Sequence, residues 1–526
     1  MNCKVDLVLF NSTNNSTYWN LGDVYHISIE KKNFEISVSK IMMSTKSDYV
    51  LFWDKNFTLP NVENIQELCK RNYDVFHGSY WNNDQMEPRY IDFVKPIWIY
   101  NLQAESSIEF SSFRSTHRNT LIKTKTYKDF TGFLNQFNTV AFEFLEFGYR
   151  VLKQGGIIRY SPILNPDKTV IDEDLSSKDN ELFINIHFTK KWSYYARFRS
   201  FFFREKKVII PQFKKSDSSI NKAESQKINS SIHSIENISI SILAPTLDRY
   251  WYVQNTINQL QNQRLKPIEI LITDQTDLRK RKKLEIENLE VPVRYFVQDK
   301  KGQVVAWNKL IKESKGNYLL FLGDDADNIY PDFCYDLAKS LIDKNSDMMA
   351  SRVVEKGISY NEIPSGIKMS DTFPITLIKK EVVVDAGCYN MFFNKGIRAD
   401  ADLAIRCHLK GALLLINNSV EIFHHRAPSG GLRAHKQRRT TFYMSQHNIR
   451  DYTIQTETEY YISYKYFSKK QIRESNFIKN ITLFTVKGNA FKKILKMGYI
   501  LFNLHAIKKK IRTHKNNALK ELATKF

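Results

Sequence analysis

The stretch Gly316–Phe333, which reads GNYLLFLGDDADNIYPDF, constrains the fold of this chain more than any other. It opens with an apolar run at 318–322, long enough for one buried strand and too short for a helix. Gly323 ends that run, and Pro331 begins a helix predicted over 332–344, because proline is tolerated in a first helical turn. Polar residues between such a strand and helix lie where open α/β sheets bind ligands, past the carboxyl end of the strand.

Three carboxylates, Asp324, Asp325 and Asp327, fall just past that strand. Carboxylates this close repel one another unless a cation relieves them. Hard divalent ions such as Mg²⁺ or Mn²⁺ take oxygen ligands and commonly share them with substrate phosphates. The acidic stretch therefore predicts a divalent metal site, with a solvent-exposed, aspartate-rich turn as the alternative.

The 526 residues leave room for about two to four domains with sizeable cores. No segment reaches the roughly 18 uncharged apolar residues of a membrane span, and no secretory signal is evident. Five cysteines are scattered without pair or metal spacing, which fits a reduced cytosol. The formal charge of +22, concentrated toward the C-terminal end, indicates nucleic acid, anionic lipid or an anionic small substrate as partner.

The first part of the chain, residues 1–211, is predicted to form one α/β unit. Strands are expected over 5–10 and 48–53, where apolar residues run together. Near its end, 192–207 mixes aromatic residues with arginine, which suits either an interfacial segment or a core helix with snorkelling ends. The polar stretch 212–237, rich in Ser, Asn and Lys, is predicted to be a linker.

The second part, residues 238–467, alternates strand and helix patterns, which predicts a largely parallel sheet with right-handed crossovers. Polar residues fall where three of its strands end, namely Thr246, Asp274 and Asp325. Because ligands bind at the carboxyl edge of such sheets, these side chains are predicted to lie on one rim. The strands are expected at 238–243, 268–273, 291–297 and 318–322.

A later helix, predicted over 397–409, carries Asp400 and Asp402 in its first turn. Acidic residues there complement the helix dipole, so a structural role is the plain alternative to a chemical one. A strand within 412–423 follows, and it leads into His424 and a second histidine.

The tail, residues 468–526, is strongly basic and mixes apolar side chains with lysine, as in FKKILKMGYILFNLHAIKKKIR. Its apolar run is too short to span a membrane. A basic amphipathic helix lying on an acidic bilayer is the favoured interpretation. A helix packed on the domain and an RNA-binding segment are the alternatives, in that order.

Residues 238–433 resemble family 2 glycosyltransferases, nucleotide-sugar enzymes of the GT-A fold. The resemblance rests on five segments that occur in the family's order with family-like gaps. They are SILAPTLDRYWYVQNTINQLQNQ from Ser241, EILITDQT from Glu269, KGQVVAWN from Lys301, FLGDDAD from Phe321 and ADADLAIR from Ala399.

The resemblance implies an inverting transfer of a sugar from a nucleotide diphosphate to an acceptor hydroxyl, with Mg or Mn on the leaving diphosphate. It implies Asp325 as metal ligand and Asp400 as the base that takes the acceptor's proton. Asp327 and His425 are implied as further metal ligands. The implied donor-binding residues are Pro245, Thr246, Arg249, Asp274, Gly302, Asn308, Asp324 and Arg433, the last in a mobile basic loop with the backbone of 429–431.

Three positions depart from the family's pattern. Gly323 stands where an aspartate is common, which shifts the implied ribose contact to Asp324 and leaves open how the three aspartates divide their roles. Trp307 stands where arginine is usual, and Ala399 replaces the glutamate before the implied base. The last two departures put the donor type in doubt more than the activity.

The N-terminal half is similar to a degraded copy of the same fold. DYVLFWDKNFTLP resembles the acidic strand with only Asp54 kept, and EFLEFGYRVLKQGG resembles the base helix with Phe144 at the base position. The resemblance therefore implies an α/β chain of two GT-A-like, Rossmann-like domains in tandem, the first degenerate and non-catalytic, plus a basic helical C-terminal tail. An unrelated α/β domain is the alternative for the first half.

The predicted function is a metal-dependent inverting glycosyltransferase of surface polysaccharide or glycan biosynthesis. Its predicted partners are a nucleotide-diphosphate sugar donor, a glycan or lipid-linked acceptor and an anionic membrane surface. The predicted location is the cytoplasm, with the inner face of the membrane as a resting place. One rival is a basic nucleic-acid-binding protein, although no recognition-module signature occurs. The other is a scaffold in which both halves have lost catalysis.

Overall fold

The computed structural model describes residues 3–10, 18–27, 31–78, 99, 102, 104–165, 177–188, 190, 192–195, 198, 234–355, 366–370, 372–394, 396–425 and 442–524. Contacts divide the chain into two units, of which the first holds 1–210, 366–369 and 408–413 and the second holds the rest. Most of the predicted linker at 212–237 and of the segment 192–207 lies outside the described residues, as do Arg433 and 429–431.

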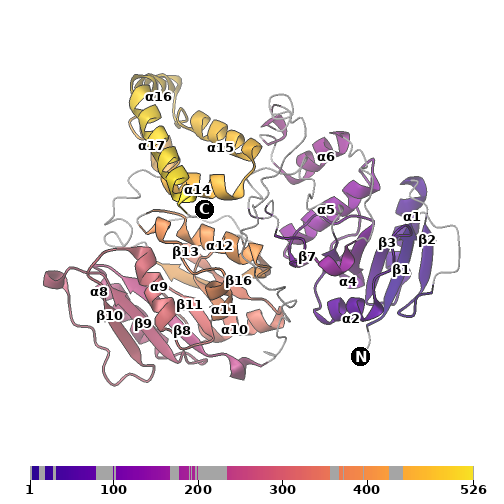
Figure 1. The fold of residues 1–526 in the computed structure, drawn as a ribbon, viewed down its shortest axis with the longest axis horizontal. Coiled ribbons are helices and arrows are strands. Elements are labelled where there is room, and N and C mark those ends of the chain that lie inside the picture. The colour runs from indigo at the N-terminus through magenta and orange to yellow at the C-terminus, as the bar shows by residue number, and fades with distance from the viewer. Residues whose placement is uncertain are drawn as a thin grey trace. The chain divides into compact units, whose positions relative to one another are not determined.

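The first unit is built on a mixed sheet in the order β2-β1-β3-β6-β4-β7-β5 (Figure 1). Its strands read as apolar runs, and β1 and β3 are buried at every position because both faces of the sheet are covered. The strands are β1 (Val5–Phe10), β2 (Val24–Ile27), β3 (Tyr49–Asp54), β4 (Val75–His77), β5 (Phe110–Ser111), β6 (Asn119–Lys123) and β7 (Ile158–Tyr160). The helices are α1 (Lys31–Ser44), α2 (Val62–Lys70), α4 (Thr124–Asp129), α5 (Val140–Lys153), η2 (Pro162–Leu164) and α6 (Ser177–His187).

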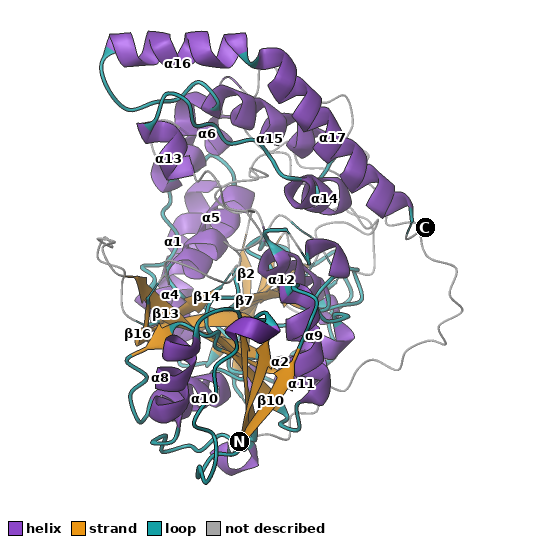
Figure 2. Cartoon of the chain, turned by 90° about the vertical axis from the view of Figure 1, so that its left-hand side faces the viewer, coloured by secondary structure: helices purple, strands orange, loops and turns teal. Residues whose placement is uncertain are grey.

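A second sheet, in the order β10-β9-β8-β11-β15-β13-β16-β12, carries the second unit. Helices α8 and α10 lie on one side of this sheet, and α9 and α11 lie on the other (Figure 2). The strands from here on are β8 (Ile240–Thr246), β9 (Glu269–Asp274), β10 (Val293–Val297), β11 (Tyr318–Phe321), β12 (Ala326–Asp327), β13 (Met348–Glu355), β14 (Ile367–Met369), β15 (Thr376–Lys379) and β16 (Leu414–His424).

The helices of this part of the chain begin with η3 and end in the C-terminal tail. They are η3 (Ile235–Asn237), α8 (Tyr250–Leu260), η4 (Leu278–Lys280), α9 (Gln303–Glu313), α10 (Phe333–Asp343), α11 (Lys380–Asp385), η5 (Met391–Phe393), α12 (Ala399–Leu409), α13 (Phe442–His447), α14 (Glu457–Tyr466), α15 (Lys469–Thr482), α16 (Ala490–Phe502) and α17 (Leu504–Ala523). Among the described residues, no helix combines the length and apolarity that a membrane crossing requires.

The parallel order predicted for the second part holds on one side of its sheet. Strands β10, β9, β8 and β11 are parallel neighbours. Beyond β11 the sheet is mixed, because β15 runs antiparallel to both β11 and β13. The expectation of a largely parallel sheet was therefore too simple.

The two sheets repeat one topology. Strands β1, β2, β3, β4, β6 and β7 have the chain order, neighbours and directions of β8, β9, β11, β13, β15 and β16. No counterpart of β10 occurs among the described residues of the first unit. This repetition confirms the predicted fold class of two Rossmann-like units in tandem.

Candidate active site

The carboxyl ends of β8, β9 and β11 bring predicted residues to one rim. Thr246 ends β8 and is paired in register with Asp274, which ends β9. The loop after β11 carries Asp324, whose Oδ2 accepts a hydrogen bond of 2.9 Å from Thr246 Oγ1. Pro245, one residue earlier on β8, is half-buried beside them. The predicted rim is therefore present, because parallel neighbouring strands end at the same edge of the sheet.

Arg249 lies between two buried carboxylates on this rim. Its Nη1 donates to Asp324 Oδ1 at 2.7 Å and to Asp325 Oδ2 at 3.1 Å. The two aspartate side chains are only 7% and 6% exposed. Burial raises the pKa of Asp324 and the charge of Asp325 adds to that effect, while Arg249 opposes both. One guanidinium shared by two buried carboxylates leaves negative charge that a further cation would relieve.

His424, the last residue of β16, contacts the second of these carboxylates. Its Nε2 lies 2.8 Å from Asp325 Oδ1. The antiparallel pairing of β12 with β16 sets Ala326 opposite His424 and so brings the imidazole to the rim. His424 was not among the predicted site residues, because nothing in a pair of adjacent histidines tells which acid each one contacts.

His425 pairs with Asp327, with His425 Nε2 2.7 Å from Asp327 Oδ2. The other oxygen, Asp327 Oδ1, accepts from Asn255 at 2.9 Å, from Gln259 at 2.6 Å and from the backbone N–H of Asn328 at 2.8 Å. Burial by itself raises the pKa of Asp327, but these hydrogen bonds outweigh it and lower the pKa to about 2. Asp327 therefore holds the loop after β11 against α8 as a charged acceptor.

Replacing Asp327 with alanine is expected to destabilise the fold by about 1–3 kcal/mol at neutral pH, because its donors lose their acceptor. The folded-state pKa of about 2 lies below the ordinary value of 3.8. The contribution is therefore complete above about pH 4 and is lost as the pH falls toward about 2. Urea unfolding of both proteins at neutral and acidic pH measures this, with the exposed Asp343→Ala as control. Equal stability of Asp327→Ala and wild type at neutral pH would contradict the prediction.

Asp274 is fully buried, and its carboxylate accepts hydrogen bonds from two tyrosines. Tyr250 donates to Oδ2 at 2.5 Å and Tyr295 donates to the same oxygen, while the backbone N–H of Thr276 donates to Oδ1 at 2.8 Å. Burial raises the pKa of both phenols and the carboxylate adds to the effect, so both stay protonated donors. Sequence reasoning missed both tyrosines. Tyr295 lies in a strand, where an aromatic residue is ordinary.

Gly302 and Asn308, both predicted to bind the donor, hold backbone in place. The Gly302 N–H donates to Gln275 Oε1 at 2.7 Å. A Cβ at Gly302 would lie 2.4 Å from Asn394 Nδ2, so a larger residue there would have to displace the Asn394 side chain. Asn308 exchanges hydrogen bonds of 2.8 and 2.9 Å with the backbone of Tyr389 and so fixes the loop before α12. A direct donor contact by either residue stays a prediction.

The two acids in the first turn of α12 have opposite environments. Asp402 is fully buried and accepts hydrogen bonds of 2.8 Å from Arg406 Nε and from Tyr466 OH. Asp400 is exposed. Burial raises the pKa of the buried Tyr389 phenol, and the charge of Asp400 adds to that effect. Of the two, Asp400 is accessible to a substrate, and Asp402 is a structural residue.

The donors at the rim fit a divalent cation shared with a diphosphate. Within the described part of the chain, no group of three or more His, Cys, Asp or Glu side chains could hold a metal. An ion such as Mg²⁺ held by one or two protein side chains and substrate phosphates does not need a third. Asp325 and His424 supply a carboxylate and an imidazole in direct contact and would be the ligands. A ligand role for Asp327 or His425 stays a prediction.

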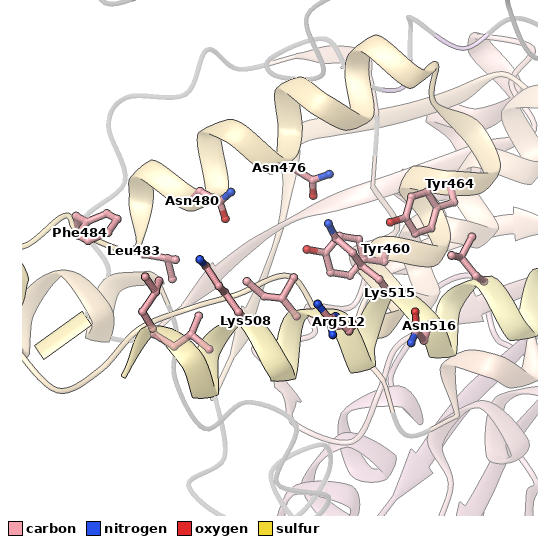
Figure 3. A pocket seen from close by; sticks show the side chains of 14 residues that line it. Tyr460, Tyr464, Asn476, Asn480, Leu483, Phe484, Lys508, Arg512, Lys515 and Asn516 are labelled. Atoms are coloured by element: carbon pink, nitrogen blue, oxygen red, sulfur yellow. The ribbon is translucent and has the colours of Figure 1, made fainter. Parts of the chain in front are cut away.

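A pocket of about 570 Å³ lies among α14, α15 and α17 in the second unit (Figure 3). Three cations spaced along one face of α17 line it, Lys508, Arg512 and Lys515, together with Tyr460 and Tyr464. No acidic side chain is among its lining residues. The pocket is therefore a basic site, distinct in composition from the acidic rim.

The first unit fills the corresponding positions with structural contacts. Phe144, on α5, packs its ring 5.1 Å from Phe52 and 4.6 Å from Phe133. Asp54, at the end of β3, is fully buried and forms an ion pair of 2.6 Å with Arg118. The first unit thus has an aromatic cluster where the second unit has its candidate base, Asp400. It has the buried Asp54–Arg118 ion pair where the second unit has the acids that follow β11.

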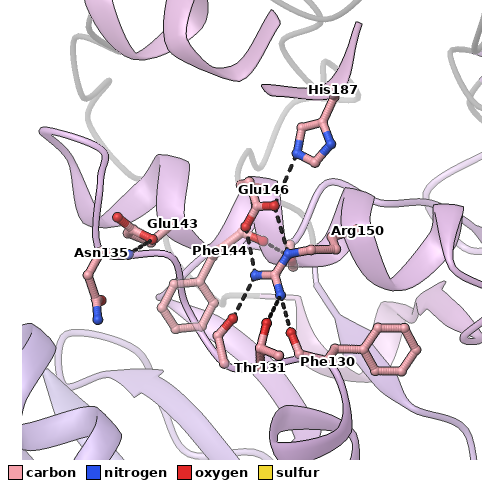
Figure 4. Close-up of polar contacts among 10 residues, drawn as sticks. Phe130, Thr131, Asn135, Glu143, Phe144, Glu146, Arg150 and His187 are labelled. Atoms are coloured by element: carbon pink, nitrogen blue, oxygen red, sulfur yellow. Dashed lines mark hydrogen bonds and ion pairs between the residues drawn. The ribbon is translucent and has the colours of Figure 1, made fainter. Parts of the chain in front are cut away.

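The carboxylates of α5 are also engaged (Figure 4). Glu146 is buried and pairs with Arg150 at 2.8 Å and with His187 at 3.0 Å. Burial raises its pKa, but hydrogen bonds from these two partners outweigh the burial and lower it. Glu143 accepts from the backbone N–H of Asn135 at 2.9 Å. Neither carboxylate is placed to act on a substrate.

Comparison with known proteins bears on the second unit. The model of the family "Glycosyl transferase family 2" matches residues 241–401. No curated protein sequence matches the chain. Solved structures are also similar to this chain, and three examples have low identity. The Staphylococcus aureus (S. aureus) TarS 1–349 complex with UDP-GlcNAc has 12% identity, 54% of this chain and 80% of that chain covered, and a TM-score of 0.35.

The other two structures are more partial. The S. aureus TarS 1–349 complex with UDP has 13% identity, 36% of this chain and 61% of that chain covered, and a TM-score of 0.30. GalNAc-T7 with UDP, GalNAc and Mn²⁺ has 13% identity, 36% and 44% covered, and a TM-score of 0.31. The chain thus spans about three fifths of the TarS complex with UDP. The family assignment rests on residues 241–401 and not on these distant likenesses. Residues 241–401 therefore match the glycosyl transferase family 2 model, and this range includes Asp274, Asp324, Asp325, Asp327 and Asp400 of the candidate site.

Proposed function

We propose that the second unit is a metal-dependent inverting glycosyltransferase that moves a sugar from a nucleotide-diphosphate sugar to an acceptor hydroxyl. The observation that carries the proposal is the rim of Asp274, Asp324 and Asp325 at the carboxyl ends of β9 and β11, inside the region that matches family 2. A buried acidic rim at this edge of an α/β sheet suits a ligand that brings both a cation and phosphates.

In the proposed reaction, the acceptor oxygen attacks the anomeric carbon from the face opposite the diphosphate. The bond from that carbon to the diphosphate oxygen breaks, and the acceptor's proton passes to the exposed carboxylate of Asp400. A divalent cation on Asp325 and His424 would neutralise charge that develops on the leaving diphosphate. Arg249, already between the rim carboxylates, adds a fixed positive charge beside them.

The nucleotide is proposed to lie against Asp274 with its two tyrosines and against Pro245 and Thr246. Arg433 would contact the diphosphate. We assign the whole protein to surface polysaccharide or glycan biosynthesis with a lipid-linked acceptor, in the cytoplasm and on the inner face of the membrane. The first unit is proposed to be non-catalytic, because its corresponding positions hold Phe144 and a paired Asp54.

Thermal melting against a panel of nucleoside diphosphates, with and without Mn²⁺, tests the proposal. A ligand that binds only the folded state stabilises it by roughly 2.7 kcal/mol at a hundredfold excess over its dissociation constant. We expect one nucleotide to raise the melting temperature when Mn²⁺ is present. The increase should vanish in Asp325→Asn and persist in Asp343→Asn, whose carboxylate forms an exposed pair with Lys339 on α10.

If no nucleoside diphosphate shifts the melting temperature, the family match describes the fold alone and the proposed donor site is wrong. A shift that occurs equally without Mn²⁺ would leave the donor site standing and remove the metal from it. A mobility shift with RNA in the absence of any nucleotide effect would favour the nucleic-acid-binding rival.

A further inference from the structure

Two lysines of helix α16 (Ala490–Phe502) donate hydrogen bonds to the backbone of the segment 445–451. Lys496 is fully buried, and its Nζ donates to the carbonyl oxygens of Ser445 and Asn448 at 3.2 Å and to that of Asp451. Lys492 Nζ donates to the carbonyl oxygen of His447 at 2.7 Å. Burial lowers the pKa of Lys496 and the charge of Asp451 opposes that effect. The inward face of this helix is thus fixed by hydrogen bonds from its lysines.

The opposite face of α16 is exposed and carries apolar side chains. Its large side chains are 42% to 90% exposed, and they recur at helical spacing along the whole helix. Gly498, in the middle of the same face, has nothing within 4 Å of the place a Cβ would occupy. A continuous exposed stripe of this kind marks an interaction surface. The residues of the stripe are Phe491, Ile494, Leu495, Met497, Leu501 and Phe502.

Exposed lysines lie on α16 itself and near the start of α17. Lys493 is exposed on α16, and Lys508, Lys509 and Lys510 are exposed on α17, which starts two residues after α16 ends. Three cations of α17 also line the pocket among α14, α15 and α17. From residue 468 to the end of the chain, acidic residues occur only at positions 474 and 521. The partner of the stripe must therefore be apolar inside and anionic at its surface.

We propose that α16 docks onto an anionic lipid bilayer, with its apolar stripe in the interface and the lysines of α16 and α17 against the headgroups. With 13 residues, the helix is about 20 Å long, too short to span and suited to lie in the interface plane. If a second copy of the chain covered the stripe, the cations of α17 in the two copies would repel one another. RNA would meet the cations and leave six apolar side chains in water. A bilayer satisfies both features at once.

The inference deepens the proposed function, because membrane binding would bring the catalytic unit to a lipid-linked acceptor. It rests on the proposed function only for the reason why the protein binds a membrane. Binding to lipid needs no donor, cation or acceptor. Asp325→Asn is therefore expected to bind vesicles as the wild type does. If the glycosyltransferase proposal fails, membrane binding can still be tested, and the reverse also holds.

Sedimentation of the full-length protein with vesicles tests the proposal. Vesicles of phosphatidylcholine alone are compared with vesicles that also contain phosphatidylglycerol. We expect binding to the anionic vesicles and at least about tenfold weaker binding to the neutral ones. The double variant Ile494→Glu/Leu501→Glu should lose binding to both, because two carboxylates would enter the interface. Val384→Glu on α11, another exposed apolar position of the second unit, should bind as the wild type does.

Two further readouts separate insertion from simple charge attraction and from misfolding. Phe491→Trp should show a blue-shifted emission with anionic vesicles, because its indole leaves water. The melting temperature of the double variant should equal that of the wild type, since both positions are exposed. Failure of the wild type to bind vesicles, or full binding by the folded double variant, would overturn the proposal. A wild-type dimer that becomes monomeric in the double variant, without lipid binding, would assign the stripe to a second copy.

Discussion

Replacing Asp325 with asparagine is expected to lower the rate of sugar transfer by about a hundredfold to a thousandfold. The substitution keeps the size of the side chain and removes its charge. In the structure this carboxylate faces His424 Nε2 at 2.8 Å and accepts from Arg249 at 3.1 Å. It is the rim acid best placed to hold a cation against the leaving diphosphate. The rate of nucleoside diphosphate release, measured with the donor that the melting panel identifies, gives the effect.

The stability of Asp325→Asn provides the control for that measurement. Asp325 contributes to the raised pKa of Asp324, because two buried carboxylates share the single guanidinium of Arg249. Removing one charge should therefore leave the free energy of unfolding equal or higher, and a lost rate cannot be ascribed to unfolding. Transfer at the wild-type rate in this variant would remove Asp325 from the proposed reaction.

Replacing Asp400 with asparagine is expected to lower the transfer rate by about a hundredfold to ten-thousandfold, the usual contribution of a general base. Asp400 is exposed at the start of α12, and its charge helps to raise the pKa of the buried Tyr389. Because the residue is proposed to act on the acceptor and not on the donor, the nucleotide-dependent melting shift should persist. Initial rates at saturating donor, together with the melting panel, measure both parts of the prediction.

Asp402 offers a matched comparison two residues further along the same helix. It is fully buried and accepts from Arg406 and Tyr466, so Asp402→Asn should destabilise the fold. The expected pattern is a slow, stable Asp400→Asn and a less stable Asp402→Asn. An Asp400→Asn enzyme within about threefold of the wild-type rate would identify a different base.

Much of the secondary structure followed from local patterns. The apolar run at 318–322, the glycine and the proline predicted β11 and α10, which the structure places at Tyr318–Phe321 and Phe333–Asp343. The acids at strand ends predicted the rim, since β8, β9 and β11 are parallel neighbours. The strand directions in the second half of the sheet could not be predicted in this way. The antiparallel direction of β15 depends on its pairing with β11 and β13 and not on its own residues.

The partners of the site residues could not be predicted in the same way. Asp274 binds Tyr295, which lies 21 positions away in another strand, and Asp325 binds His424 through the pairing of β12 with β16. His425, which was predicted as a further metal ligand, pairs with Asp327, another predicted ligand, and its ligand role stays a prediction. In each case the residue type was visible, and the partner depended on how separate elements are brought together.

The sequence by itself determined several strands and helices, among them β11 and α10, and the set of acids available for chemistry, whereas the tandem repeat was implied by a family resemblance. It could do so because strand and helix periods, glycine and proline act within a few residues. The tertiary structure decided that Asp400 is exposed and Asp402 is buried on the same helix, and it gave His424 and His425 different acidic partners. It also turned Lys496 inward on α16. Burial and pairing depend on contacts between distant parts of the chain, and a local pattern does not contain them.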